Sequence, residues 1–173
     1  MSYLISFMED YRKTFNKIYN QYIEKIYRFI FLKVNSQEVA EDLTSETFLR
    51  VFESLKNQEK IENPQAFLYR IARNLVTDYY REKRKTQIIS PESVSIRDPR
   101  PGLEEKMALN SDLEQIKASL ANLKEDYQNV IIWHYLDGLS IPEVAKLLGR
   151  TEEATRVLLH RALKTLREKI ESS

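Results

Sequence analysis

The chain has 173 residues, of which 42% are hydrophobic and 31% charged, and it contains no cysteine. This length allows one ordinary domain or two small ones, and the lack of cysteine excludes disulfides and thiolate metal sites. Two histidines and three glycines leave little material for a zinc site and none for a glycine-rich phosphate loop. We therefore expect neither a metal ion nor a cofactor. Because the sequence shows no signal segment and no apolar run near the ~20 residues that span a bilayer, we expect a cytoplasmic protein.

The net charge of +1 conceals blocks of alternating sign along the chain. Residues 1–35, 66–85 and 150–169 are net positive, whereas residues 36–65 and 104–126 are net negative. A positive block attracts phosphates locally even when the total charge is near zero. The small total predicts weaker long-range attraction to free DNA than a strongly basic repressor would have.

Apolar residues recur at steps of three or four through the first half of the chain, which is typical of helices. The first predicted helix ends near Val34, and Ser36 is a plausible N-cap for a second. Asn63, followed by a proline, begins a third helix that ends near Lys85. No segment alternates in the manner of a β-strand.

The second half of the chain begins with a change of composition. Residues 87–104 hold three of the five prolines and have no helical period, so they predict a flexible linker. Helical spacing then resumes and continues to the end. We therefore expect an all-α protein of two small helical domains, residues 1–86 and 105–173, joined by this linker.

The last two predicted helices have the spacing of a helix-turn-helix. Ser140 and Glu143 form a capping box at the start of the first, Gly149 ends it, and Thr151 caps the second. When such a motif docks in the major groove of DNA, side chains near the N-terminus of its second helix reach the edges of the bases. Cationic side chains on the same helix are suited to contact phosphates. The turn and outward face comprise Arg150, Thr151, Glu152, Glu153, Arg156, His160 and Lys164. A helical hairpin with a merely solvated outer face is the alternative.

A basic face is predicted along the third helix. It consists of Arg70, Arg73, Asn74, Thr77, Arg81 and Arg84. Tyr80 lies beside this face, and cations next to an aromatic ring suit single-stranded nucleic acid. The alternative is a solvated surface. Ion pairs between residues four positions apart do not explain this cluster of cations, because side chains at that spacing, such as Arg81 and Lys85, carry like charges.

The second helix instead carries a mostly acidic ridge. It comprises Glu41, Asp42, Ser45, Glu46, Leu49, Arg50 and Glu53. Paired carboxylates can perform acid–base or metal chemistry, but no histidine, glycine loop or nucleophile accompanies them. A docking ridge for a basic partner protein is favoured, and a solvated face is the remaining alternative.

Three segments, taken in order, resemble the bacterial RNA polymerase sigma factors of the extracytoplasmic-function group, in the sigma-70 family. They are AEDLTSETFLRV, then NPQAFLYRIARNLVTDYYREKRK, then the C-terminal helix-turn-helix after the linker. The resemblance covers nearly the whole chain. It implies a non-catalytic initiation subunit that binds core RNA polymerase, directs it to promoters and promotes strand opening.

The resemblance also implies roles for particular residues. The second helix would dock on the clamp helices of the polymerase β′ subunit through Asp42, Ser45, Glu46 and Leu49. The third would recognise the −10 element through Asn63, Arg70, Arg73, Asn74, Tyr80, Arg81 and Arg84. The loop 57–64 would take a flipped base, and unstacking that base costs a few kcal/mol. The helix-turn-helix would bind the −35 element through Arg150, Thr151, Glu152, Glu153, Arg156, His160 and Lys164.

The partners that the resemblance implies are core RNA polymerase, through its β′ and β subunits, promoter DNA, and an anti-sigma factor that in many members is membrane-anchored. It implies no small-molecule substrate. The alternative is a stand-alone helix-turn-helix regulator that acts without polymerase, which leaves the acidic ridge unexplained. An enzyme is a third reading, but the sequence offers no nucleophile–base pair or metal set to support it.

Overall fold

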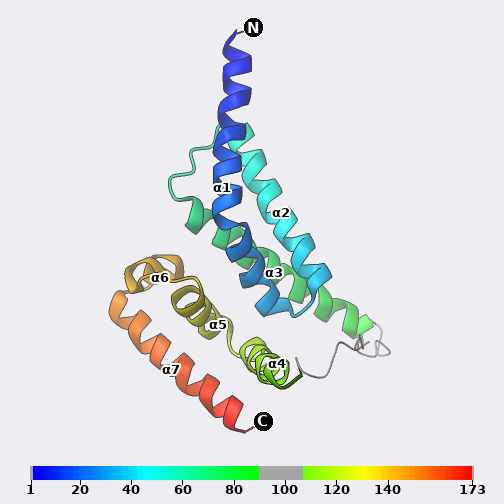
Figure 1. The fold of residues 1–173 in the computed structure, drawn as a ribbon, viewed down its shortest axis with the longest axis vertical. Helices are drawn as coiled ribbons and strands as arrows, with labels where there is room; N and C mark the ends of the chain where they lie inside the picture. Colours follow the sequence, from blue (N-terminus) through cyan, green and yellow to red (C-terminus); the bar gives the residue numbers. More distant parts are fainter. Residues whose placement is uncertain (1, 90–106, 173) are drawn as a thin grey trace.

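The computed structural model describes residues 2–89 and 107–172, and every regular element in these two ranges is helical. The first domain consists of α1 (Ser2–Val34), α2 (Gln37–Lys56) and α3 (Pro64–Ile89). Figure 1 shows α2 running beside α1 while α3 crosses both. The three helices enclose an apolar core. Its buried members include Ile26, Ile30, Phe48, Val51, Leu68 and Leu75.

Two of the predicted helix starts in this domain are confirmed. The hydroxyl of Ser36 accepts a hydrogen bond from the Val39 amide at 3.4 Å, and the side-chain oxygen of Asn63 accepts from the Ala66 amide at 3.0 Å. These bonds satisfy amides that a helix N-terminus leaves unpaired. The chain therefore enters α2 and α3 where the sequence predicts.

Helix α3 continues to Ile89, beyond the predicted end near Lys85. Nothing in the intervening sequence stops it, because the first proline that could do so is residue 91. The hydroxyl of Thr86 donates to the Glu82 carbonyl at 3.1 Å, within the helix. The first residues of the predicted linker are thus helical, and its remainder from residue 90 lies outside the described residues.

The second domain consists of α4 (Met107–Ala121), α5 (Glu125–Ile131), the π-helical turn η2 (Ile132–Leu136), α6 (Ile141–Leu148) and α7 (Glu152–Glu171). The sequence predicts α5 and η2 as one uniform helix. The structure widens its last turn, so that the Asp137 amide donates to the Ile132 carbonyl, five residues back, at 2.9 Å. Such π-helical turns are often found at functional sites.

The helix-turn-helix has the predicted caps. The amide of Ser140 donates to the Glu143 carboxylate at 2.7 Å, and the hydrogen bonds from Ser140 lower the pKa of that carboxyl. Gly149 ends α6 in the left-handed conformation at φ 64°, which glycine adopts without steric cost. The Thr151 hydroxyl then accepts from the Ala154 amide at 3.2 Å and starts α7.

The two domains are packed against one another. Helix α4 lies against α1, and α6 approaches α3, as Figure 1 shows. The buried apolar side chains of both domains form one connected core. None of the described helices combines the length and apolar character needed to cross a membrane.

Candidate nucleic-acid interface

The basic face of α3 lies on the surface. Its members Arg70, Asn74, Thr77, Arg81 and Arg84 are exposed, and Arg73 is half-buried. The guanidinium of Arg70 lies 5.3 Å from the centre of the Phe67 ring, an arrangement that orients a cation while leaving it accessible. The helical period of α3 thus places this basic face on the side of the helix opposite the buried core residues, as predicted.

Part of the positive charge on α3 is balanced within the helix. Arg81 pairs with Asp78 at 3.2 Å, and Lys85 pairs with Glu82 at 3.1 Å. These pairs span three residues, a spacing that the prediction from pairs four residues apart leaves out. Ion pairs within the helix therefore balance the charge of Arg81 and of its neighbour Lys85. Exposed pairs of this kind contribute only about 0.2–0.5 kcal/mol each and yield readily to a phosphate.

Tyr80 is less available than predicted. Its ring is half-buried, and its hydroxyl donates a hydrogen bond to the carbonyl of Lys33 at the end of α1. Burial raises the pKa of Tyr80. The ring of its neighbour Tyr79 is half-buried too, with the two ring centres 5.2 Å apart. Only part of the Tyr80 ring can stack on a base in this conformation.

A cavity of about 600 Å³ lies beside the N-terminal end of α3. The loop predicted to take a flipped base contributes to it from residue 59 to residue 63, together with Arg70 and Arg73. The sequence gives no hint of the opposite wall, which comes from the second domain. This wall contains Trp133, Lys146 and Leu147.

The acidic ridge of α2 is exposed along most of its length. Asp42, Ser45 and Leu49 are exposed, and Glu46 is half-buried in an ion pair with Arg50 at 2.9 Å. Leu49 is 50% exposed, which is unusual for a leucine within a helical domain. Leu49 is thus an exposed apolar side chain within a row of carboxylates.

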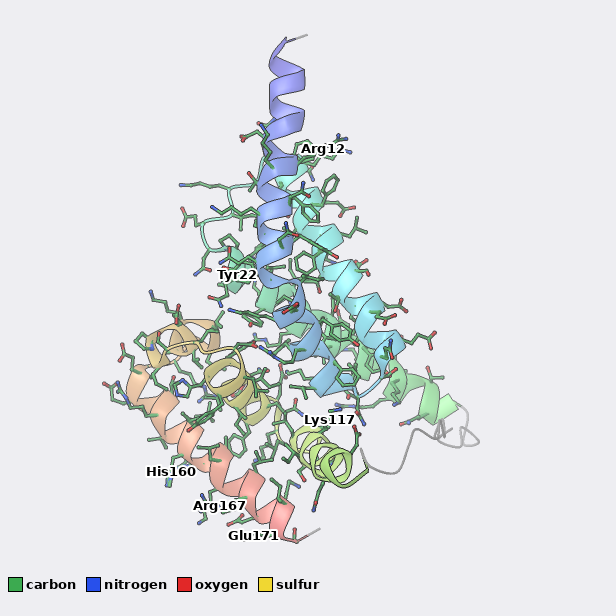
Figure 2. The ribbon with its side chains drawn as sticks, in the orientation of Figure 1. Arg12, Tyr22, Lys117, His160, Arg167 and Glu171 are labelled. Carbon is green, nitrogen blue, oxygen red and sulfur yellow. The ribbon has the colours of Figure 1, made fainter. Side chains whose placement is uncertain are left out.

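The outer face of α7 presents the predicted side chains to solvent. Glu152, Glu153, Arg156, His160 and Lys164 are all exposed, whereas Thr155 and Ala162 on the opposite side are buried. Figure 2 shows His160 on the side of α7 turned away from the first domain. The second helix of the motif is therefore open to a DNA groove.

Four predicted side chains near the turn already have partners. Arg150 pairs with Asp126 at 2.6 Å, Arg156 pairs with Glu152 at 3.2 Å, and the Thr151 hydroxyl serves as the cap of α7. The first pair joins the turn to the start of α5. Arg150 therefore also fixes the motif to the rest of its domain, a role that sequence periodicity does not reveal.

A groove of about 790 Å³ runs along α7 on the helix-turn-helix. Its floor is apolar, from Ile141, Leu159 and Leu163, and its rim includes both histidines, His134 and His160. Arg156, Lys164 and Arg167 complete the rim. Arg167, which Figure 2 places on the same outer side as His160, joins Lys164 as a cation suited to a DNA phosphate.

The contact between the domains contains polar residues that sequence analysis missed. Arg28 and Tyr69, from α1 and α3, both donate to the carboxylate of Asp137 at the end of η2. Arg28 also donates to the Leu136 carbonyl at 3.0 Å. Within the described ranges, no group of three or more His, Asp or Glu side chains is placed to hold a metal ion.

A helix-turn-helix with an accessible second helix, joined to a three-helix domain with a basic face, defines an all-helical DNA-binding protein. Comparison with known families gives two matches. Sigma-70 region 2 matches residues 18–86, and Sigma-70, region 4 matches residues 113–166.

Individual relatives agree with these matches. The chain is 32% identical over 138 residues to the ECF RNA polymerase sigma factor ShbA of Streptomyces griseus, covering 77% of this chain and 72% of that protein. It is 30% identical over 154 residues to the ECF sigma factor BldN of Streptomyces coelicolor, covering 88% of this chain but 58% of BldN. The chain belongs to the ECF sigma factors of the sigma-70 family, and a stand-alone regulator is not favoured.

A solved structure has the same fold. The sigma factor RpoE of Bartonella quintana, in complex with the anti-sigma factor NepR, superimposes with a TM-score of 0.65 at 23% identity, covering 92% of this chain and 98% of that one. At this identity the likeness establishes the all-helical fold. Sigma factors are in general non-catalytic regulators of transcription.

Proposed function

We propose that this chain binds core RNA polymerase, directs it to specific promoters and assists strand opening, without enzymatic activity of its own. The observation that carries this proposal is the separation of three surfaces on one small chain. These are the acidic ridge of α2, the basic face of α3 and the outer face of α7. A subunit that links an enzyme to two DNA elements needs three such surfaces.

The acidic ridge is the proposed polymerase contact, through Asp42, Ser45, Glu46 and Leu49. Exposed carboxylates around a half-exposed leucine support this role, since an apolar anchor within a charged rim is a common form of protein interface. The partner surface would be basic, as the β′ clamp helices are expected to be. The β subunit is a second expected contact.

The basic face of α3 is the proposed −10 surface, through Asn63, Arg70, Arg73, Asn74, Tyr80, Arg81 and Arg84. The outer face of α7 and its turn form the proposed −35 surface, through Arg150, Thr151, Glu152, Glu153, Arg156, His160 and Lys164. Exposure of most of these side chains supports both roles. The corresponding domains are the first, which α3 extends to Ile89, and residues 105–173, with the linker between them.

Two further expectations complete the proposal. The relative RpoE of Bartonella quintana is bound to an anti-sigma factor, and we infer that an anti-sigma factor also restrains this chain. A cytoplasmic location follows from the proposed partner, since bacterial RNA polymerase acts there.

Reversal of charge on the ridge tests the proposal. The double variant Asp42→Lys with Glu46→Lys should weaken binding to bacterial core RNA polymerase by at least about tenfold, because like charges then face the basic partner. Binding is measured by fluorescence anisotropy of the labelled chain. The matched control is Glu168→Lys with Glu171→Lys, which reverses two exposed carboxylates at the end of α7.

Transcription supplies the second measurement. Core polymerase is mixed with a library of random promoters, and transcript starts are sequenced with and without the wild-type chain. Specific starts that depend on the chain are expected. Equal core binding by the ridge variant and its control would refute the assignment of the ridge, and the absence of any chain-dependent start would refute the function itself.

A further inference from the structure

The contact between the two domains is built around a buried carboxylate. The side chain of Asp137 has no solvent exposure, whereas that of its partner Arg28 is 43% exposed. Both oxygens of Asp137 accept hydrogen bonds, one from Arg28 and the other from Tyr69. Burial, followed by the negative charge of Asp137, raises the pKa of Tyr69, so its hydroxyl stays a donor. One carboxylate of the second domain thus holds two helices of the first.

Three aromatic rings pack together at this contact, and one of them is Tyr69. Phe29 and Trp133 are stacked, with ring centres 5.7 Å apart and planes 10° apart. Tyr69 meets both edge-on, at 5.3 Å from Phe29 and 5.5 Å from Trp133. All three are at most 1% exposed. The rings contribute buried apolar area to the contact, and the hydrogen bonds of the carboxylate fix how the two domains are oriented.

The same contact covers part of the proposed −10 surface. Arg73 lies 3.8 Å from the carboxylate of Glu125 at the start of α5, where a DNA phosphate would otherwise be its partner. The cavity beside the flipped-base loop is walled on its far side by Trp133 and Lys146. In this arrangement the second domain occupies space that a promoter strand needs.

The contact also has features that favour separation. Among the residues that the structure describes, Nε of Arg28 and Nε1 of Trp133 are buried without a hydrogen-bond partner. An unsatisfied buried polar group costs about 1–3 kcal/mol, and this cost is relieved when water reaches it. Polar contacts between domains of one chain commonly open and close.

We propose that this contact is an autoinhibitory lock, centred on Asp137, which withholds Arg73 and the cavity beside the flipped-base loop from DNA until the domains separate. The inference rests on the proposed function of α3. It assigns to one buried carboxylate the regulation of DNA binding. Because full contact with DNA needs the open form, the apparent affinity falls in proportion to the fraction of molecules that are open.

Two substitutions in the full-length chain test the lock from its two sides. Asp137→Asn removes the charge while keeping the shape, and Arg28→Met removes the cation from the first domain. The matched control is Glu168→Gln, which removes an exposed carboxylate of α7 away from the contact. Circular dichroism establishes that each variant is folded. Arg28→Met keeps the test decisive if Asp137→Asn unfolds the second domain.

Two quantities are measured for each variant. The first is the radius of gyration in small-angle X-ray scattering, which should increase in both lock variants and not in the control. The second is the dissociation constant for a fluorescent single-stranded DNA 20-mer of random sequence. It should fall by about tenfold if the open form makes up about a tenth of the free wild-type chain.

The outcomes separate this inference from the proposed function. An unchanged radius of gyration, or an increased radius with unchanged DNA affinity, overturns the lock. Adding Arg70→Ala and Arg73→Ala to Asp137→Asn should abolish the gain in affinity. If the gain persists while the radius is still increased, the domains do open but α3 is not the DNA surface, and the proposed function of α3 is then what fails.

Discussion

Lys33 is a cation buried at the end of α1. Its side chain is 2% exposed, and its ammonium lies 4.7 Å from the centre of the Phe29 ring. Burial lowers the pKa of Lys33 from 10.5 to about 8, although the negative charge of Glu125 acts in the opposite direction. The folded chain therefore disfavours the charged form of this side chain.

This shift predicts that stability rises with pH between about 8 and 10. In that window the unfolded chain holds a proton on Lys33 that the folded chain has released, so the free energy of unfolding increases by up to about 1.4 kcal/mol per pH unit. Above 10 the buried tyrosines, whose pKa values are raised from 10.0, act in the opposite direction. Urea unfolding of the wild type and of Lys33→Met measures the effect. The variant should lack this increase, and an identical slope in both proteins would contradict the prediction.

Exposed residues were more predictable than the residues at the contact. Asp42 and Arg84 follow from helical period alone, because a helix with one apolar stripe presents its other residues to solvent. Tyr69 and Asp137 are 68 residues apart in sequence and are buried only because two domains meet. No local pattern encodes such a meeting, so the sequence could not identify either residue.

At the scale of elements, the capping box of α6 should make a measurable contribution to stability. Ser140→Ala removes the hydroxyl that accepts from the Glu143 amide and should lower the free energy of unfolding by about 0.5–2 kcal/mol. Chemical denaturation measures the change. Ser45→Ala, at an exposed position inside α2, serves as the control and should change stability by much less. A loss that is equal in the two variants would show that the box does not stabilise the motif.

The helix starts were predictable because a cap is a local signal that involves residues within four positions of each other. The caps at Ser36, Asn63 and Thr151 all occur where the sequence indicates. The turn η2 was not predictable, since a π-helical turn retains the apolar spacing of the helix that it ends. The same holds for the last turn of α3, which continues because no residue in the sequence stops it.

For the whole molecule, the connected core predicts one cooperative thermal transition. The buried side chains of the two domains are continuous through Phe29, Tyr69 and Trp133, so neither domain should unfold alone. In differential scanning calorimetry the wild type should give one peak, with calorimetric and van't Hoff enthalpies equal. Asp137→Asn should split the peak into two, whereas Glu168→Gln should not. Two peaks in the wild type would contradict the prediction.

The packing of the two domains brings charge blocks of opposite sign next to one another. The acidic start of α5 faces the positive first domain, through the contact of Glu125 with Arg73 and its influence on Lys33. Alternating blocks therefore neutralise one another within the free chain. The near-zero net charge is consistent with a subunit whose DNA affinity emerges after its domains have moved apart.

Trp133 is the one tryptophan in the sequence, and it lies at the contact between the domains, stacked on Phe29. The fluorescence of a buried indole has its maximum at short wavelength, and this maximum shifts to longer wavelength when the indole becomes exposed to water. The protein thus carries an intrinsic optical reporter of its own conformation. Stopped-flow mixing with polymerase or DNA can follow that reporter in real time, in the unlabelled natural sequence.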